Sequence, residues 1–304
     1  APTTTRPTTT APTTTRPTTT VPTTTERPWY EGKCGDNLTW ALYTPASGEK
    51  GELVISGTGD MIDLLSGSAP WDHVRSYIES VTVSDGVTSI GDFAFSHLYY
   101  CKEIKLADSV KSIGKSAFSA CYNLESIKIP DGVISIDESA FGSCEQLENI
   151  TIPNGIKSIA YRTFYACLNL KNISLPDGLT DIGVSAFESC RGLENITIPN
   201  SVTNIGDRAF LDCEKLKSIA IPYGVPSIGK YVFYGCEQLE NVTIPNSVTH
   251  IAQGAFAEIK SVKVSPDHPT LITDEAGALI DIKKGILLIF CSKSNDLASL
   301  ALIS

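Results

Sequence analysis

The sequence is poor in histidine and has no recognisable catalytic motif. Its four histidines, His73, His97, His250 and His268, are scattered along 304 residues. No HExxH, GxSxG, Walker or G-x-G-x-x-G pattern occurs, and no Cys and His residues lie at metal-ligand spacing. SGTGDM at 56–61 contains two glycines but no helix signature follows it, which favours a turn. We therefore expect no enzymatic activity, no cofactor and no metal.

The sequence also lacks a basic surplus and a long apolar run. The net charge is −10, and residues 1–28 contribute +2 from three arginines and one glutamate, so −12 remains for residues 29–304. Nucleic acids and anionic membranes attract basic surfaces, which argues against both as partners. The longest apolar run, GILLIF at 285–290, is much shorter than the roughly 20 residues of a membrane span. We expect no membrane insertion.

Residues 1–28 differ from the rest because they hold five PTTT units spaced five residues apart. Such a tract cannot bury apolar area, and its prolines stiffen it. We expect a disordered, extended linker that reaches on the order of 85 Å in polyproline II conformation. Thr-rich tracts with proline are also substrates for O-glycosylation, although a plain interdomain linker explains the composition as well. Either interpretation predicts a further domain upstream.

The remaining sequence is dominated by a repeat. CEQLENITIPN at 144–154 returns as CEQLENVTIPN at 236–246, four periods of 23 residues later. A fixed period of this size indicates a solenoid, propeller or array, and one short strand in each 23-residue unit favours a leucine-rich-repeat solenoid. The isoleucine positions are Ile90, Ile113, Ile136, Ile159, Ile182, Ile205, Ile228 and Ile251, and a phenylalanine follows each by five, at Phe95, Phe118, Phe141, Phe164, Phe187, Phe210, Phe233 and Phe256.

Each repeated position has a physical role. Alternating I-x-I, as in Ile127 and Ile129, predicts a strand with one buried face, and neighbouring units would form a parallel sheet. The following Pro130 cannot donate to a sheet, and Asp131-Gly132 predicts a turn. The A-F-x-x-C-x-x-L segment spaces apolar residues three apart, which predicts a short helical or 3-10 turn on the opposite side.

The pattern L-x-x-I-x-I-P-x-x-V-x-x-I-G-x-x-A-F-x-x-C resembles the BspA-like, Treponema-type leucine-rich repeat of bacterial surface proteins. The resemblance covers about residues 78–264. Residues from Cys34 resemble the β-hairpin region that often precedes such repeats. We therefore expect an α/β solenoid shaped as a right-handed arc, with a linker at 1–28, an N-terminal β-hairpin cap at 29–77, repeats at 78–264 and an irregular C-terminal cap at 265–304.

Nine cysteines in an exported protein would ordinarily suggest disulfides. Six of them occupy one repeat position, so their side chains should point the same way into the core as unreactive small hydrophobes. Cys34, Cys101 and Cys291 lie outside this column. A bridge that involves Cys34 or Cys291 stays open because both lie in the predicted caps.

Two surfaces are candidates for binding. The first is the exposed side of the predicted sheet, because solenoids commonly bind through extended faces. Its small polar groups are also able to bond with one another, which is the structural alternative. The residues are Asn149, Thr151, Asn172, Ser174, Asn195, Thr197, Asn241 and Thr243, with lysines towards both ends of the same columns.

The second surface lies on the opposite side and contains two tyrosine pairs. Tyr161 and Tyr165 are four apart, and Tyr231 and Tyr234 are three apart, so each pair would share a helical turn. Exposed aromatic residues are frequent anchors for proteins, and they also stack on sugar rings. The structural alternative is that one ring of each pair covers the outer core.

These features predict a non-catalytic, secreted or cell-surface module, monomeric and bacterial by its resemblance. The resemblance implies an extracellular protein partner, since members of this family act as adhesins. Two alternatives remain open at this point. One is attachment to carbohydrate as an accessory module of a cellulosomal or glycan-degrading protein. The other is a targeting arm for an enzyme whose catalytic domain lies outside this chain.

Overall fold

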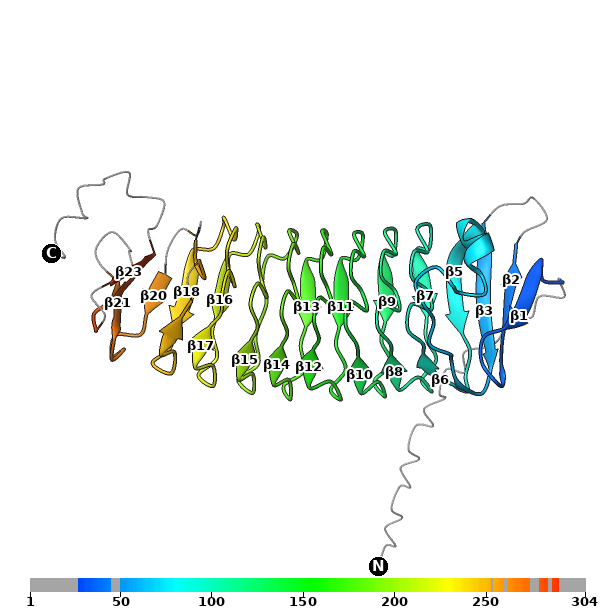
Figure 1. The fold of residues 1–304 in the computed structure, drawn as a ribbon, viewed down its shortest axis with the longest axis horizontal. Coiled ribbons are helices and arrows are strands. Elements are labelled where there is room, and N and C mark those ends of the chain that lie inside the picture. The colour runs from blue at the N-terminus through cyan, green and yellow to red at the C-terminus, as the bar shows by residue number, and fades with distance from the viewer. Residues whose placement is uncertain are drawn as a thin grey trace, which may run out of the picture.

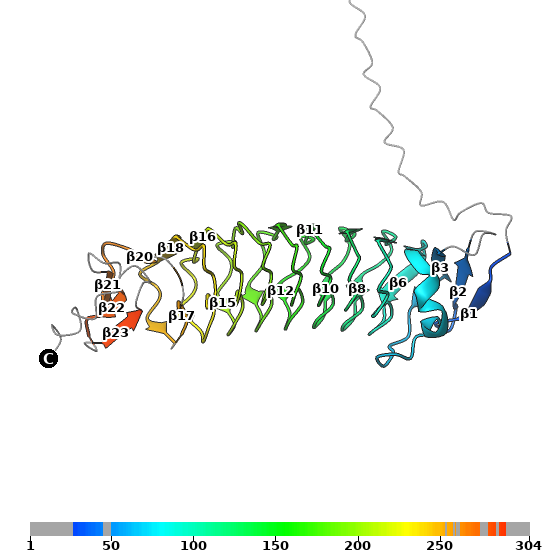
Figure 2. The same ribbon diagram turned by 90° about the horizontal axis from the view of Figure 1, so that it is seen from above.

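The computed structural model describes residues 27–44, 50–252, 254–257, 259, 262–273, 279–283 and 286–289. Within them the chain winds into an extended stack of coils, one for each repeat, with an antiparallel hairpin sheet at either end (Figure 1 and Figure 2). Nearly all of the predicted linker lies outside the described residues, as does Cys291, so the proposed bridge partner is not placed.

Strands from successive repeats, except the repeat that contains Asn195, pair in parallel in three sections that together are here called the strand face (Figure 1). In most of these strands the middle residue is buried and its neighbours are exposed, as in Asn149, Ile150 and Thr151. Partners are 23 residues apart up to β18, so Ile104 lies opposite Ile127 and the buried isoleucines are stacked, whereas β18 and β20 pair at a spacing of 20. The strands are β5 (Ile78–Val83), β7 (Glu103–Lys105), β9 (Ser126–Lys128), β11 (Asn149–Thr151), β13 (Asn172–Ser174), β16 (Ser218–Ala220), β18 (Asn241–Ile244) and β20 (Val262–Val264).

A second strand in each repeat, which the sequence analysis did not predict, belongs to a narrower row of parallel strands in three sections, here called the second sheet. It follows the proline turn and ends at the repeated isoleucine, as in Ser112–Ile113. The strands are β4 (Gly59–Asp60), β6 (Val87–Ile90), β8 (Ser112–Ile113), β10 (Ser135–Ile136), β12 (Ser158–Ile159), β14 (Asp181–Ile182), β15 (Asn204–Ile205), β17 (Ser227–Ile228) and β19 (His250–Ile251).

The third side of each coil, here called the turn face, differs from the expected helical or 3-10 turn. In the second repeat Ser116 and Ala120 have φ of 52° and 58°, in the left-handed region. Because of this backbone, the N–H groups of Ser116, Phe118 and Ala120 donate to carbonyl oxygens of the next coil. Amides that bond between coils cannot continue a helix within one coil. In the described residues the only helix is the 3-10 helix η1 (Asp72–Tyr77), in the N-terminal cap.

The core is a continuous column of stacked rings. Phe95, Phe118 and their six successors are fully buried, and neighbouring rings lie 5.2–5.8 Å apart with nearly parallel planes. Trp71 extends the column from the N-terminal cap at 5.5 Å from Phe95, and its Nε1 donates to the Ala94 carbonyl at 3.0 Å. The tryptophan thus replaces the phenylalanine of a preceding repeat and closes the open end of the core.

Both ends carry antiparallel strands. At the N-terminus β1 (Tyr30–Lys33), β2 (Leu38–Tyr43) and β3 (Gly51–Gly57) form a meander, and β3 pairs in parallel with β5. The cap therefore continues the strand face. At the C-terminus β21 (Leu271–Thr273), β22 (Leu279–Asp281) and β23 (Ile286–Ile289) form a separate antiparallel sheet. These sheets cover the two ends, where unpaired edges would otherwise be open.

Candidate functional site

The strand face brings the predicted asparagine, serine and threonine side chains into two exposed rows. Asn149, Thr151, Asn172 and Ser174 lie opposite one another in β11 and β13. Asn172 Nδ2 donates to Asn149 Oδ1 at 2.8 Å, so these two amides partly satisfy each other. The next repeat places Asn195 and Thr197 in the same two rows. In β18, Thr243 is exposed and Asn241 lies opposite Ser218 of β16.

A groove opens in the middle of this face, where strand pairing is interrupted. The segment after β13 makes only an isolated bridge, between Asn195 and Ser218, and is not paired with β13 as a strand. The resulting depression has a volume of about 270 Å³. Amide and hydroxyl groups line its sides, and the partly buried Leu175 contributes apolar surface. Its exposed polar lining consists of Asn172, Ser174, Asp177, Asn195 and Thr197.

The N-terminal part of the strand face is charged rather than amide-rich. Lys105 and Lys128 are opposite each other in β7 and β9, and Lys105 Nζ pairs with Glu103 at 3.1 Å. Thr82, which lies opposite Lys105 in β5, is buried because β3 of the cap packs beside β5. Its hydroxyl donates to Glu52. β11 separates this charged section of the sheet from the groove.

The tyrosine pairs lie on the turn face, but the members of the first pair meet through an arginine. The Arg162 guanidinium carbon is 5.1 Å from the Tyr161 ring centre and 4.8 Å from the Tyr165 ring centre. In the second pair Tyr231 and Tyr234 are in edge contact at 5.9 Å. Tyr161 and Tyr231 are exposed, whereas Tyr165 and Tyr234 are half-buried. Sequence reasoning missed Arg162.

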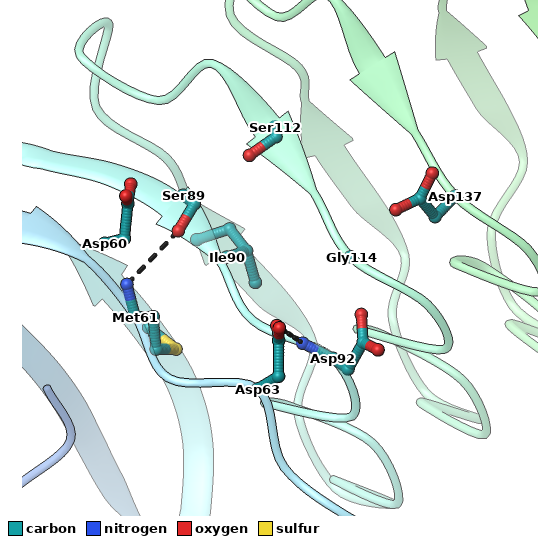
Figure 3. A pocket seen from close by; sticks show the side chains of 9 residues that line it. All are labelled: Asp60, Met61, Asp63, Ser89, Ile90, Asp92, Ser112, Gly114 and Asp137. Atoms are coloured by element: carbon teal, nitrogen blue, oxygen red, sulfur yellow. Dashed lines mark hydrogen bonds between the residues drawn. The ribbon is translucent and has the colours of Figure 1, made fainter.

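An acidic depression of about 420 Å³ lies beside the second sheet, where the cap joins the first repeats (Figure 3). Three of its aspartates accept hydrogen bonds that stabilise the fold. Asp63 Oδ1 accepts the Asp92 N–H at 3.1 Å, and Asp92 Oδ1 accepts the Lys115 N–H at 2.7 Å. Asp60 Oδ1 accepts the Thr88 hydroxyl at 2.6 Å. These bonds tie successive coils together.

Asp137 at the far side of this depression has a raised pKa (Figure 3). Partial burial is the main cause, and the nearby Asp92, Glu138 and Asp63 carboxylates add to it. In the described part of the chain no group of three or more histidine, cysteine or carboxylate residues is placed to hold a metal ion. The depression therefore gives no donor set on which to base a metal site.

The six column cysteines are buried free thiols, and each Sγ donates to a backbone carbonyl rather than only filling space. Cys167, for example, donates to the Phe141 oxygen at 3.1 Å. Burial raises the pKa of Cys167 and Cys236 to about 12, so the thiolate that nucleophilic chemistry requires is disfavoured. Cys34 is likewise buried with a free thiol, and burial raises its pKa to about 12.

Comparison with known proteins agrees with this geometry. The model of the BspA type leucine-rich repeat region matches residues 74–194 and 157–275, in six copies. A leucine-rich cell surface protein from Faecalibacterium prausnitzii A2-165 is 27% identical, with 76% of each chain covered and a TM-score of 0.54. A leucine-rich repeat protein from Bacteroides ovatus ATCC 8483 is also 27% identical, with 76% of this chain and 70% of that one covered and a TM-score of 0.52.

A leucine-rich repeat protein from Eubacterium ventriosum ATCC 27560 shares the fold, at 24% identity and a TM-score of 0.56, with 78% of this chain and 73% of that one covered. No curated protein matches the chain significantly. In the described residues, no helix has the length and hydrophobicity needed to span a bilayer.

Proposed function

This chain belongs to the BspA-type leucine-rich repeat family, and from that premise we propose that it is a non-catalytic extracellular module that binds a protein partner through its strand face. The groove between β13 and Asn195–Thr197 carries the proposal. It combines amide, hydroxyl and carboxylate groups from two repeats with a partly apolar lining. Polar groups that fix orientation around an apolar surface are the usual composition of a recognition site.

The rigidity of the face favours binding. Isoleucines below each strand are buried, and the stacked phenylalanines hold successive coils at a constant spacing. A partner that docks on such a surface orders few additional groups, so little of the interaction free energy is lost to conformational entropy. Exposure on the cell surface is supported by the Faecalibacterium relative, which is described as a cell surface protein.

The test is a binding assay with the full chain. Immobilised fibronectin, fibrinogen and mucin are presented beside insoluble cellulose and xylan, and retention is measured for the wild type and for Thr197→Glu. The substitution puts a charged, longer side chain into the groove. We expect retention on at least one of the proteins, and at least a tenfold loss of affinity in the variant.

Thr203→Glu is the matched control, because it makes the same change in the same repeat at an exposed position that does not line the groove. Equal losses in the two variants would show that the groove is not the contact surface. Retention on polysaccharide alone would replace the proposal with carbohydrate attachment. Circular dichroism of each variant checks that the fold is kept.

A further inference from the structure

The turn face of the fourth to seventh repeats carries a cluster of aromatic and cationic side chains. We call it the tyrosine–arginine patch. Tyr161 and Tyr231 are 40% and 38% exposed, and Val184, in the coil after Tyr161, is 41% exposed. Backbone bonds join the coils that carry them, since Arg162 N–H donates to the Val184 oxygen at 3.1 Å. The patch consists of Tyr161, Arg162, Tyr165, Arg208, Tyr231 and Tyr234.

The two arginines of the patch occupy the same position in their repeats. Each precedes a buried phenylalanine by two residues, and both have left-handed backbones, with φ of 53° for Arg162 and 57° for Arg208. The rings of Phe164, Phe187 and Phe210 are 5.6 and 5.3 Å apart along the stack. Repeat geometry therefore separates the two arginine positions by about 11 Å, the sum of these two steps.

Aromatic rings, not carboxylates, hold both guanidinium groups. Arg162 lies against Tyr161 and Tyr165, and the Arg208 guanidinium carbon is 5.8 Å from the Tyr231 ring centre. Among the residues that the structure describes, neither arginine forms an ion pair with a carboxylate. Contact with a ring face orients a guanidinium without neutralising it, so its accessible N–H groups remain available to a carboxylate. The Arg162 Nε is buried, so a carboxylate would be bound through the terminal Nη groups.

The surroundings of the patch are electrically balanced in a chain whose net charge is −10. Lys230 adds a third cation in the coil after Arg208. Of the neighbouring acids, Asp207 is engaged by the Lys230 N–H, which its Oδ1 accepts at 2.7 Å. Glu188 is half-buried. Asp212, whose N–H donates to the Tyr234 oxygen at 2.8 Å, is a third acid, so three cations and three acids balance on this part of the turn face.

We propose that the tyrosine–arginine patch binds an acidic segment of a partner protein, with two carboxylates about 11 Å apart on Arg162 and Arg208. An extended chain advances roughly 3.3 Å per residue, so acidic residues three or four apart fit this spacing. Tyrosine and arginine are the residues that most often dominate protein interfaces. This surface is separate from the strand-face groove and adds a second contact to the module.

The test uses fluorescence anisotropy with the full chain and a labelled ten-residue peptide. The peptide carries two glutamates separated by three alanines, and a second peptide replaces both glutamates with glutamine. We expect the glutamate peptide to bind more tightly than its glutamine counterpart. The double variant Arg162→Gln, Arg208→Gln should lose at least tenfold in affinity. Glutamine meets the same backbone requirement as arginine at these φ values, so the fold is preserved.

Arg191→Gln is the matched control, because Arg191 is an exposed arginine paired with Glu214 at 3.2 Å outside the patch. It should bind the peptide as the wild type does, and so should the groove variant Thr197→Glu, which separates this inference from the strand-face proposal. Equal affinity for the two peptides, or equal loss in Arg191→Gln, would overturn the inference. So would binding of heparin with no binding of the glutamate peptide, which would identify the patch as a site for anionic glycans.

Discussion

Cys144 Sγ donates a hydrogen bond to the backbone oxygen of Phe118, which lies 26 residues earlier, at 3.3 Å. The same oxygen accepts the Cys121 N–H at 3.3 Å. One buried carbonyl thus receives two donors, an amide from its own coil and a thiol from the next. The thiol bond recurs in every coil from Cys121 to Cys236, and the carbonyl with two donors recurs from Cys144 to Cys236. It explains why this core position is a thiol rather than an alanine.

The thiol donor predicts an order of stability for two small substitutions. Cys167→Ala removes both the donor to Phe141 and the sulfur volume, so it should lower the free energy of unfolding by about 1–2 kcal/mol. Cys167→Ser keeps a donor and should cost no more than Cys167→Ala, although a hydroxyl is more polar. Urea unfolding followed by circular dichroism measures both. A serine variant less stable than the alanine variant would show that the thiol acts only as a small hydrophobe.

The buried thiols also predict how stability depends on pH. Burial raises the pKa of Cys167 from 9.0 to about 12, and the pKa of Cys101 and of Cys236 likewise. Below pH 9 folded and unfolded thiols are both protonated, so this contribution is fully present. Between pH 9 and 12 only the unfolded thiols lose protons, so unfolding is favoured as the pH rises.

Each such thiol lowers the stability by up to about 1.4 kcal/mol per pH unit in that window. Urea midpoints at pH 8, 9.5 and 10.5 measure the decline, and Cys167→Ser should show a shallower slope because it has one thiol fewer. The same slope in that variant would assign the decline to other groups. Ellman's reagent should leave the column cysteines unmodified at pH 8 until the chain is unfolded.

At the left-handed positions of the turn face, a substitution by glycine should stabilise the protein, whereas elsewhere such a substitution usually destabilises it. Ala166 has φ of 55°, which costs an L-residue roughly 1–2 kcal/mol, more than the roughly 0.5–1 kcal/mol that glycine loses in chain entropy. Ala166→Gly should therefore stabilise the protein by about 0.5 kcal/mol. Ala160, also half-buried but without a positive φ, is the matched control. Ala160→Gly should destabilise by about 0.5–1 kcal/mol. Thermal unfolding distinguishes the two, and a loss in both would contradict the prediction.

Asp137 opposes folding at neutral pH. Burial and the neighbouring carboxylates raise its pKa, so its protonated form is favoured in the folded state. The protein therefore gains stability from this carboxyl group as the pH falls through the raised pKa. At pH values above that pKa the group contributes no such stability. Asp137→Asn should raise stability at pH 7, by less than about 1 kcal/mol because water screens a largely accessible carboxylate. The gain should vanish at pH 3, where Asp137 itself is protonated. Thermal unfolding at both pH values tests this, and an unchanged gain at pH 3 would exclude the electrostatic explanation.

The solenoid and its parallel strands followed from the 23-residue period, because each apolar column can be buried only against its neighbours. The second strand was missed because two residues such as Ser112 and Ile113 are too short to show alternation. The turn-face backbone was assigned wrongly for a related reason. Apolar residues three apart suit a helical turn, and non-glycine residues at this φ give no sequence signal.

The candidate binding surfaces were also predictable from the sequence only in part. Which side chains are exposed on the strand face was predictable from I-x-I alternation, since side chains in a strand point alternately to opposite sides. The binding roles of those residues and of the tyrosines stay predictions. The groove was not predictable, because it lies where strand pairing is interrupted after β13. No pattern in the sequence marks that interruption. The same holds for Arg162, whose position between Tyr161 and Tyr165 depends on the left-handed turn.

The sequence by itself thus determined the period, the buried columns and the absence of a catalytic motif, since these depend on which residue types recur and how far apart. Only the tertiary structure decided how the coils bond to one another. The cysteine thiols, the left-handed amides and Trp71 all find their partners in a neighbouring coil. Such contacts join residues about 23 positions apart, and their geometry is set by stacking rather than by any local pattern.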